Sequence, residues 1–392
     1  MPHILLEDCF LASPCESEGY NFKTIFKYKN EHRTEYKILV EKEKSEFLLS
    51  LKQKDNTWLL KSDKTTRISP IEIVKNSINA YAKLTNSKIL FSNTQNLGKA
   101  KASDAYHKDI SFFLNDFNNL RKNKKTFLEI GFGSGRHLLY LAKKNPEDVF
   151  IGLEIHKPSL EQVLRQIHLQ GLKNIYLLDY DARIFLEFLS SNSLEKIFVH
   201  FPVPWDKKPH RRVFSKDFIN QSLRVLSPNS SLELRTDSRK YFDFCLGLTT
   251  NLNRAKIQID INKELEISSK YEDRWKKQEK NIYDIKLYSQ NISKELELFD
   301  DFSFECEFDF DKIIQKEYKN PFVFSKYFVH FEKIYILSKT SGLILLSFGD
   351  FSRPLSKYLI FENNKCRYFQ GKPLASFANI EAHKKIKELL SQ

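Results

Sequence analysis

The chain has 392 residues, 41% of them hydrophobic, which is enough apolar material for two or three folded domains. The formal net charge of +13 favours a polyanionic partner, with nucleic acid first and a membrane surface second. No apolar run reaches the roughly 18 residues that a bilayer span needs, and the first residues do not resemble a secretion signal. The five cysteines are scattered and lack metal-ligand spacing, which predicts reduced thiols, a cytoplasmic protein and no bound metal.

Residues 1–104 are predicted to form a β-rich module with a trailing helix. Alternating apolar and polar residues predict four strands, at 22–28, 36–40, 46–51 and 57–61. We expect the helix to begin with Ser69 as its cap, Pro70 in the first turn and Glu72 reaching back to the cap. Apolar residues at helical spacing then continue to Tyr81.

Residues 105–290 alternate between strand and helix patterns, which predicts an α/β domain with a largely parallel sheet. The expected strands are 126–131, 149–155, 175–179, 195–201, 231–236, 256–261 and 282–289. The expected helices are 137–144, 158–170, 182–190, 215–226 and 239–249. Ligands of such sheets bind beyond the carboxyl ends of the strands, so residues at those ends are the candidates for a site.

Residues 291–392 return to a β-rich pattern. Strict alternation predicts a strand at 302–310, and further strand patterns lie within 322–338, 343–348 and 358–361. A short helix is expected at 382–390. The two flanking modules could share one sheet.

A glycine-rich loop, Gly131 to Gly135, follows the first strand of the central domain and precedes a helix. Such a loop lets a ligand approach the backbone at a helix N-terminus. The position of a third glycine in the dinucleotide fingerprint holds Arg136, which disfavours a nicotinamide oxidoreductase. Glu129, two residues before Gly131, suits a cationic ligand instead. S-adenosylmethionine fits this description, because it carries a sulfonium and an ammonium group and no phosphate.

Acidic residues also end the next two predicted strands. Glu154 lies 23 residues after Gly131, where an acid commonly accepts the hydroxyls of a ribose, although an exposed strand-end acid is the alternative. Asp181 ends the third strand and could receive an adenine amine, cap the following helix, or do both. Asp179 competes with it for the adenine.

The segment from His200 to Arg212 is rich in proline and in basic residues. Two prolines flank Val203 just past a strand end and restrict the loop backbone. Trp205 offers a stacking face for a base. Four cations suit phosphate groups: Lys207, Lys208, Arg211 and Arg212.

Two further segments contain candidate residues. Thr236 and Asp237 end the fifth strand. Ser269 and Glu272 have the spacing of a capping box, and Glu272 could equally contact a substrate.

These motifs, in this order, resemble those of the bacterial tRNA (guanine-N7)-methyltransferase family. The resemblance rests on Phe127–Gly135, Phe150–His156, Phe201–Arg212, Thr236–Asp237 and Ser269–Glu272, and it covers about half the chain, roughly 105–290. It implies a Rossmann-like class I methyltransferase that uses S-adenosylmethionine on a variable-loop guanosine of tRNA. It also implies cofactor contacts by Glu129, Glu154 and Asp181, beside the glycines Gly131 and Gly133. The implied substrate contacts are Lys207, Asp237, Ser269 and Glu272.

The chain departs from the family pattern at two positions. Val203 stands where the family usually has an aspartate between the prolines, and Ser269 stands where it usually has threonine. The aspartate serves the cofactor and the reaction, so the catalytic residue is left unassigned. We expect activity to survive, with Asp237 or Glu272 providing negative charge. The alternatives are a weakly active or non-catalytic tRNA-binding homologue and a methyltransferase of another RNA. The sequence does not indicate the oligomeric state.

Overall fold

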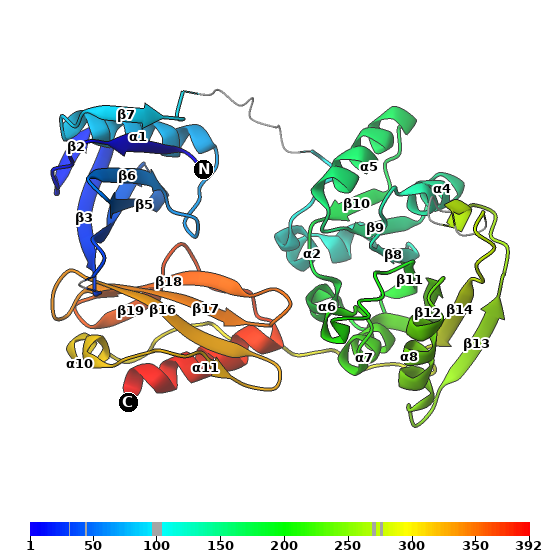
Figure 1. The fold of residues 1–392 in the computed structure, drawn as a ribbon. Helices are drawn as coiled ribbons and strands as arrows, with labels where there is room; N and C mark the ends of the chain where they lie inside the picture. Colours follow the sequence, from blue (N-terminus) through cyan, green and yellow to red (C-terminus); the bar gives the residue numbers. More distant parts are fainter. Residues whose placement is uncertain (31, 44, 96–103, 269–271, 275–276) are drawn as a thin grey trace. The chain divides into compact units, whose positions relative to one another are not determined.

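The computed structural model describes residues 1–392 except 31, 44, 96–103, 269–271 and 275–276 (Figure 1). The chain divides into two compact units. The central unit is Ala102–Glu297, whereas Met1–Lys101 and Leu298–Gln392 together form the other unit. The sequence predicts the two flanking segments as separate modules that could share one sheet. In the structure their strands form one sheet.

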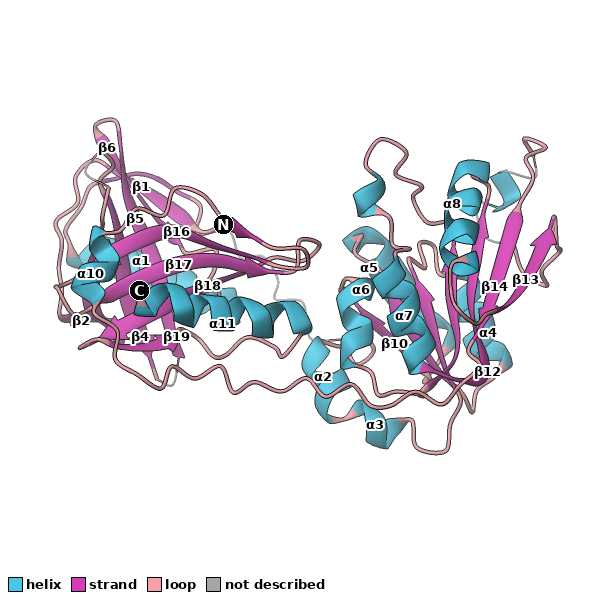
Figure 2. Ribbon diagram, turned by 90° about the horizontal axis from the view of Figure 1, so that it is seen from below, coloured by secondary structure: helices cyan, strands magenta, loops and turns pink. Residues whose placement is uncertain are grey.

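The described residues of the flanking unit form a 12-stranded sheet in the order β19-β18-β17-β16-β3-β4-β5-β6-β1-β7, with β2 on β3 and β15 on β16. The strands are β1 (His3–Leu6), β2 (Cys15–Ser17), β3 (Tyr20–Tyr28), β4 (Glu35–Lys42), β5 (Ser45–Lys54), β6 (Thr57–Ser62), β7 (Ile89–Ser92), β15 (Phe322–Val323), β16 (Phe328–Ile336), β17 (Gly342–Gly349), β18 (Leu355–Glu362) and β19 (Lys365–Tyr368). The helices are α1 (Ile71–Leu84), α10 (Phe310–Gln315) and α11 (Phe377–Ser391). Helix α11 packs across β16 and β17 (Figure 2).

Strand pairing and buried charges join the two halves of this unit. Residues of β16 pair with β3 through Tyr335 opposite Tyr28. Glu35, on β4, accepts hydrogen bonds of 2.7 Å from both Lys333 and Tyr335, which are about 300 positions later in the chain. These buried polar groups obtain their partners only when both halves are present, and the two halves lie in one compact unit.

Two local expectations for this unit are wrong. Residues 302–309 form no strand; Phe302 and Phe308 are buried in the C-terminal core, and Asp309 caps α10. Some of the alternating residues are buried, as Phe302 and Phe308 are, but Cys306 is exposed, and a segment outside any sheet accommodates this pattern. Ser69 is not the cap of α1, because Pro70 occupies that position and makes no side-chain cap bond.

The central unit contains a seven-stranded sheet, counted over the described residues, in the order β10-β9-β8-β11-β12-β14-β13. Its strands are β8 (Thr126–Ile130), β9 (Val149–Leu153), β10 (Ile175–Leu178), β11 (Leu194–His200), β12 (Leu226–Thr236), β13 (Lys256–Ile261) and β14 (Tyr283–Tyr288). The first five in this order are parallel, and β14 runs antiparallel to both β12 and β13. This arrangement confirms the predicted Rossmann-like methyltransferase sheet and every strand predicted for it.

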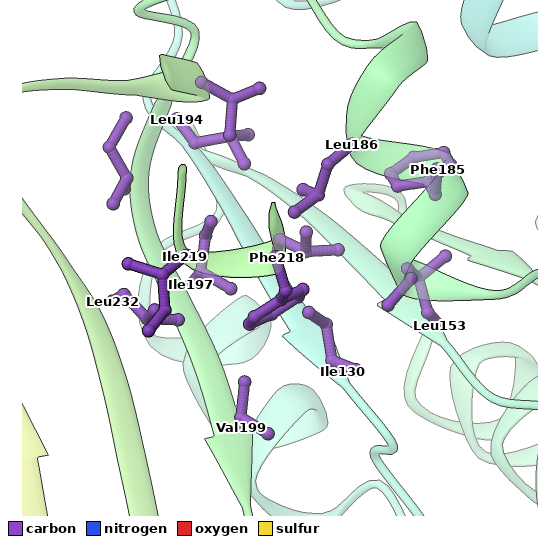
Figure 3. Packing of buried hydrophobic residues seen from close by; sticks show 14 of the residues in the cluster. Ile130, Leu153, Phe185, Leu186, Leu194, Ile197, Val199, Phe218, Ile219 and Leu232 are labelled. Atoms are coloured by element: carbon purple, nitrogen blue, oxygen red, sulfur yellow. The ribbon is translucent and has the colours of Figure 1, made fainter. Parts of the chain in front are cut away.

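Helices cover the two faces of this sheet. They are α2 (Ile110–Asn115), α3 (Phe117–Leu120), α4 (Arg136–Lys144), α5 (Lys157–Gln170), α6 (Ala182–Phe185), α7 (Lys216–Val225) and α8 (Arg239–Thr250), with 3-10 turns at Leu186–Phe188 and Pro209–Arg211. On one face, Ile130, Ile197 and Leu232 pack with Phe185 and Phe218 of α6 and α7 (Figure 3). On the other face, α4 and α5 cover β8 to β10. No helix in the described part of the chain is long and apolar enough to cross a membrane.

Candidate functional site

The glycine loop lies at the carboxyl edge of the parallel strands, directly after β8. Gly131, Gly133 and Gly135 all have positive φ, at +70°, +52° and +71°. A Cβ added at Gly131 would meet no protein atom within 4 Å, whereas one at Gly135 would lie 2.5 Å from a methyl group of Val163. Gly131 therefore borders open space beside the loop, while Gly135 is required for packing α4 against α5.

Glu154 contacts this loop from the end of β9. Its Oε2 accepts a 3.0 Å hydrogen bond from the Gly133 amide, and its Oε1 accepts a 2.9 Å bond from the His156 amide. The structure thus brings together two residues that the sequence predicts to hold the same ligand. The two backbone donors hold the carboxylate in place at the strand end.

Glu129 lies on β8 and is 4% exposed. Its Oε2 is 2.8 Å from Nδ1 of His137, on the first turn of α4. The sequence patterns do not indicate His137 as a site residue. The available signal was a histidine in the helix that follows the glycine loop, and that signal alone does not indicate which carboxylate it meets.

Asp181 follows β10 and caps α6, accepting a bond from the Arg183 amide. It also forms a two-point contact with the Arg183 guanidinium, at 3.0 Å and 2.7 Å. The predicted capping role is therefore observed. Glu129, Glu154 and Asp181 thus lie on or just after three neighbouring parallel strands, β8, β9 and β10.

The basic loop after β11 is braced by Arg212. Its Nε donates a 2.7 Å bond to the Pro204 carbonyl, and its guanidinium lies 4.4 Å from the ring centroid of Phe244. Arg212 is 9% exposed, so it is buried behind this loop rather than at the surface. The prolines are thus not the only restraint on this loop.

The remaining cations and Trp205 of the loop lie at the surface. Trp205 is 37% exposed, and the Arg211 guanidinium lies 5.2 Å from the centroid of its ring. Lys207 and Lys208 are exposed, and Val203 is 60% exposed. This surface combines positive charge with an aromatic face, as the sequence predicts.

Asp237 and Glu272 have different surroundings. Asp237 follows β12, and its carboxylate lies 3.4 Å from the ammonium of Lys280 with 22% of its side chain exposed. Glu272 is 1% exposed, and it accepts a 2.9 Å hydrogen bond from Arg235. Arg235 is also buried, and the sequence patterns do not indicate it as a candidate residue. Arg235 also contacts Asp284 at 2.7 Å, which makes a buried ion cluster. Ser269, the predicted partner of Glu272, lies outside the described residues.

The chain is similar to known methyltransferases. A family model described as "Putative methyltransferase" matches residues 123–285. A tRNA (guanine-N(7)-)-methyltransferase of Wolinella succinogenes is 42% identical over 100% of both chains. Proteins of the same name from Helicobacter hepaticus and Campylobacter fetus are each 40% identical, over 100% and 89% of both chains respectively. The similarity includes the flanking segments as well as the central unit. The chain therefore belongs to the tRNA (guanine-N7)-methyltransferase family.

Proposed function

We propose that this protein transfers a methyl group from S-adenosylmethionine to N7 of a variable-loop guanosine in tRNA, in the cytoplasm. The observation that carries the proposal is the full-length similarity to relatives of that name, at 42% and 40% identity. The acidic and glycine-rich sheet edge supports it, because its chemistry suits this methyl donor.

The residues at the sheet edge fit the parts of the donor. The Glu129 carboxylate suits the ammonium group, and Gly131 leaves the space beside the loop free of side-chain atoms. Glu154 retains lone pairs for ribose hydroxyls beyond its two backbone donors. Both carboxylate oxygens of Asp181 already contact Arg183, so a hydrogen bond from the adenine amine would have to share one of these oxygens with the guanidinium.

The proposed reaction places modest demands on the protein. S-adenosylmethionine supplies an electrophilic methyl group on a positively charged sulfur. Guanine N7 presents an in-plane lone pair and carries no proton, so no side chain has to act as a general base. The residues of this chain would therefore act by aligning the base, excluding water and stabilising the positive charge of the product.

Asp237 is the better of the two candidates for that stabilising charge. Asp237 directly follows the carboxyl end of β12 and is partly exposed, whereas Glu272 is buried against Arg235. Lys207, Lys208 and Arg211 would bind tRNA phosphates, and Trp205 would stack on a base.

The test is transfer of a tritiated methyl group from S-adenosylmethionine to unmodified tRNA, followed by mapping of the modified nucleotide. We expect one labelled variable-loop guanosine. Label in another RNA would identify a different methyltransferase. Binding of tRNA with no label, where a known enzyme succeeds, would identify a non-catalytic homologue and reject the proposal.

A further inference from the structure

One face of the central sheet carries a row of polar side chains, Glu129, Glu233 and His200, around Phe198. Glu129 on β8 pairs in register with Phe198 on β11, which pairs with Glu233 on β12. Residues paired in register point to the same face of a sheet, and His200 lies two positions after Phe198 on that face. Helices α4 and α5 cover the apolar part of this face over β8 to β10.

His137 of α4 inserts into this row. Its Nδ1 lies 2.8 Å from Oε2 of Glu129, and its ring centroid lies 4.7 Å from those of both Phe198 and His200. His200 in turn lies 3.2 Å from Oε1 of Glu233. The side chains of His137 and Glu129 are only 11% and 5% exposed, so solvent does not compete strongly for their contact.

Neighbouring charges complete the surroundings of His137. Glu129 and Glu233 face it as carboxylates, and His200 and Lys196 face it as basic groups. Lys286, on β14, lies 3.3 Å from Glu233. The described residues include no group of three or more histidine, cysteine or acidic side chains placed to hold a metal ion, so a metal centre does not explain the row.

We propose that His137 is a positioning residue, which holds the Glu129 carboxylate in the orientation that receives the ammonium group of S-adenosylmethionine. The inference rests on the proposed use of this donor. A glutamate side chain has three rotatable bonds, and fixing one oxygen removes much of that freedom before the ligand arrives. The bond to His137 engages Oε2, and lone pairs of the carboxylate remain for the ligand.

The arrangement also links donor binding to protonation. Burial lowers the pKa of His137, but attraction and hydrogen bonding from Glu129 outweigh this effect and raise the pKa above its usual value. An ammonium group arriving at Glu129 shares the same carboxylate with the imidazolium. Binding of the donor therefore favours release of a proton from His137, and the affinity for the donor rises as the pH rises through that pKa.

Calorimetric titration of the full-length protein with S-adenosylmethionine tests the inference without relying on methyl transfer. Titrations of wild type, His137→Leu and His137→Asn in two buffers of different ionisation enthalpy give both affinity and proton release. The matched control is His168→Asn, because His168, in the last turn of α5, makes a histidine–carboxylate contact of similar length with Asp104, at 2.7 Å, and is more exposed than His137.

At a pH above the pKa of His137, where no imidazolium competes for Glu129, we expect His137→Leu to weaken binding by about tenfold, a change of about 1.4 kcal/mol. Proton release is measured at a pH below that pKa. His137→Asn, which keeps a donor, should recover part of the affinity and lose the buffer-dependent proton release. The control should match wild type in both respects. Wild-type affinity in His137→Leu, or wild-type proton release in His137→Asn, would overturn the inference alone. Failure of wild type to bind the donor at all would overturn the proposed function as well.

Discussion

The amide of Gly133 donates a 3.0 Å hydrogen bond to the carboxylate of Glu154, which joins the glycine loop after β8 to the end of β9. One side chain therefore restrains the loop and presents oxygen atoms at the same edge. Glu154 therefore has two separate roles, which are to hold the glycine loop by a hydrogen bond and to supply a negative charge. Mutation can separate these two roles.

Replacing Glu154 with alanine should weaken binding of S-adenosylmethionine by about 1.5–3 kcal/mol, the usual range for charge-assisted hydrogen bonds. Glu154→Gln should lose less, because its amide oxygen still accepts the Gly133 bond. Calorimetry measures both. Glu147→Ala removes an exposed acid just before β9 and should bind as wild type does. Equal affinities for Glu154→Ala and wild type would exclude a cofactor contact at this position.

Arg211 and Arg212 are adjacent in sequence and should behave differently. Arg211→Ala should weaken tRNA binding and reduce the salt dependence of that binding by about one phosphate contact, with an unchanged melting temperature. Arg212→Ala should lower the free energy of unfolding by about 1–3 kcal/mol, because the Pro204 carbonyl loses its donor. Filter binding against salt and thermal unfolding separate the two effects. If Arg211→Ala and Arg212→Ala both changed only tRNA binding, or both changed only stability, the different roles given to these two residues would be wrong.

Asp237 and Glu272 form a second pair with opposite expectations. Asp237→Asn should reduce kcat by about tenfold through loss of negative charge near the product. Its stability should change little, because its contact with Lys280 is part-exposed. Glu272→Ala should instead destabilise the central unit by about 3 kcal/mol, because it removes one partner of the buried Arg235. Single-turnover kinetics and urea unfolding measure these changes. An Asp237→Asn enzyme with wild-type kcat would contradict the role proposed for this carboxylate.

Acidification should destabilise the flanking unit through Glu35. Burial opposes ionisation of this carboxyl, but hydrogen bonds from Lys333, Tyr335 and Lys52 lower its pKa to about 2. Because the pKa in the folded state is depressed, the stabilisation is present above the unfolded value of about 4.5 and is lost as the pH falls towards 2. Glu35→Gln should therefore cost about 3 kcal/mol at pH 7 and progressively less as the pH falls below 4.5. A cost that is the same at pH 7 and at pH 3 would refute this account.

The flanking segments should fold only together. Residues 298–392 expressed alone should lack cooperative unfolding, because Lys333 and Tyr335 would lose Glu35, and β16 would lose its pairing with β3. Coexpression with residues 1–101 should restore a complex that unfolds cooperatively. Circular dichroism and gel filtration of the separate and coexpressed fragments provide the measurement. A stably folded 298–392 fragment would show that the shared sheet is dispensable.

Much of the central unit follows from local sequence alone. The strands β8 to β11 there are short, mostly apolar runs, the others include alternating residues, and the longer helices have an apolar face at regular spacing, so both patterns are complete within about a dozen residues. The acids Glu129 and Glu154 follow from the rule that ligands meet the carboxyl ends of parallel strands, which needs no knowledge of side-chain contacts. Local sequence patterns therefore specify the fold of this unit, the place of its candidate site and the family resemblance.

Which side chains become partners depends on how the whole chain folds. His137 meets Glu129, Arg235 meets Glu272 and Arg212 turns inward to Pro204, and no periodicity encodes these choices. The same limit applies to the flanking segments, where alternation predicts strands without saying which strands pair. The strand predicted at 302–310 is wrong for the same reason, because apolar residues in alternation can be buried without hydrogen bonds to a neighbouring strand. Contacts between residues far apart in sequence depend on how the whole chain packs, and this packing makes one unit from two ends separated by almost 200 residues.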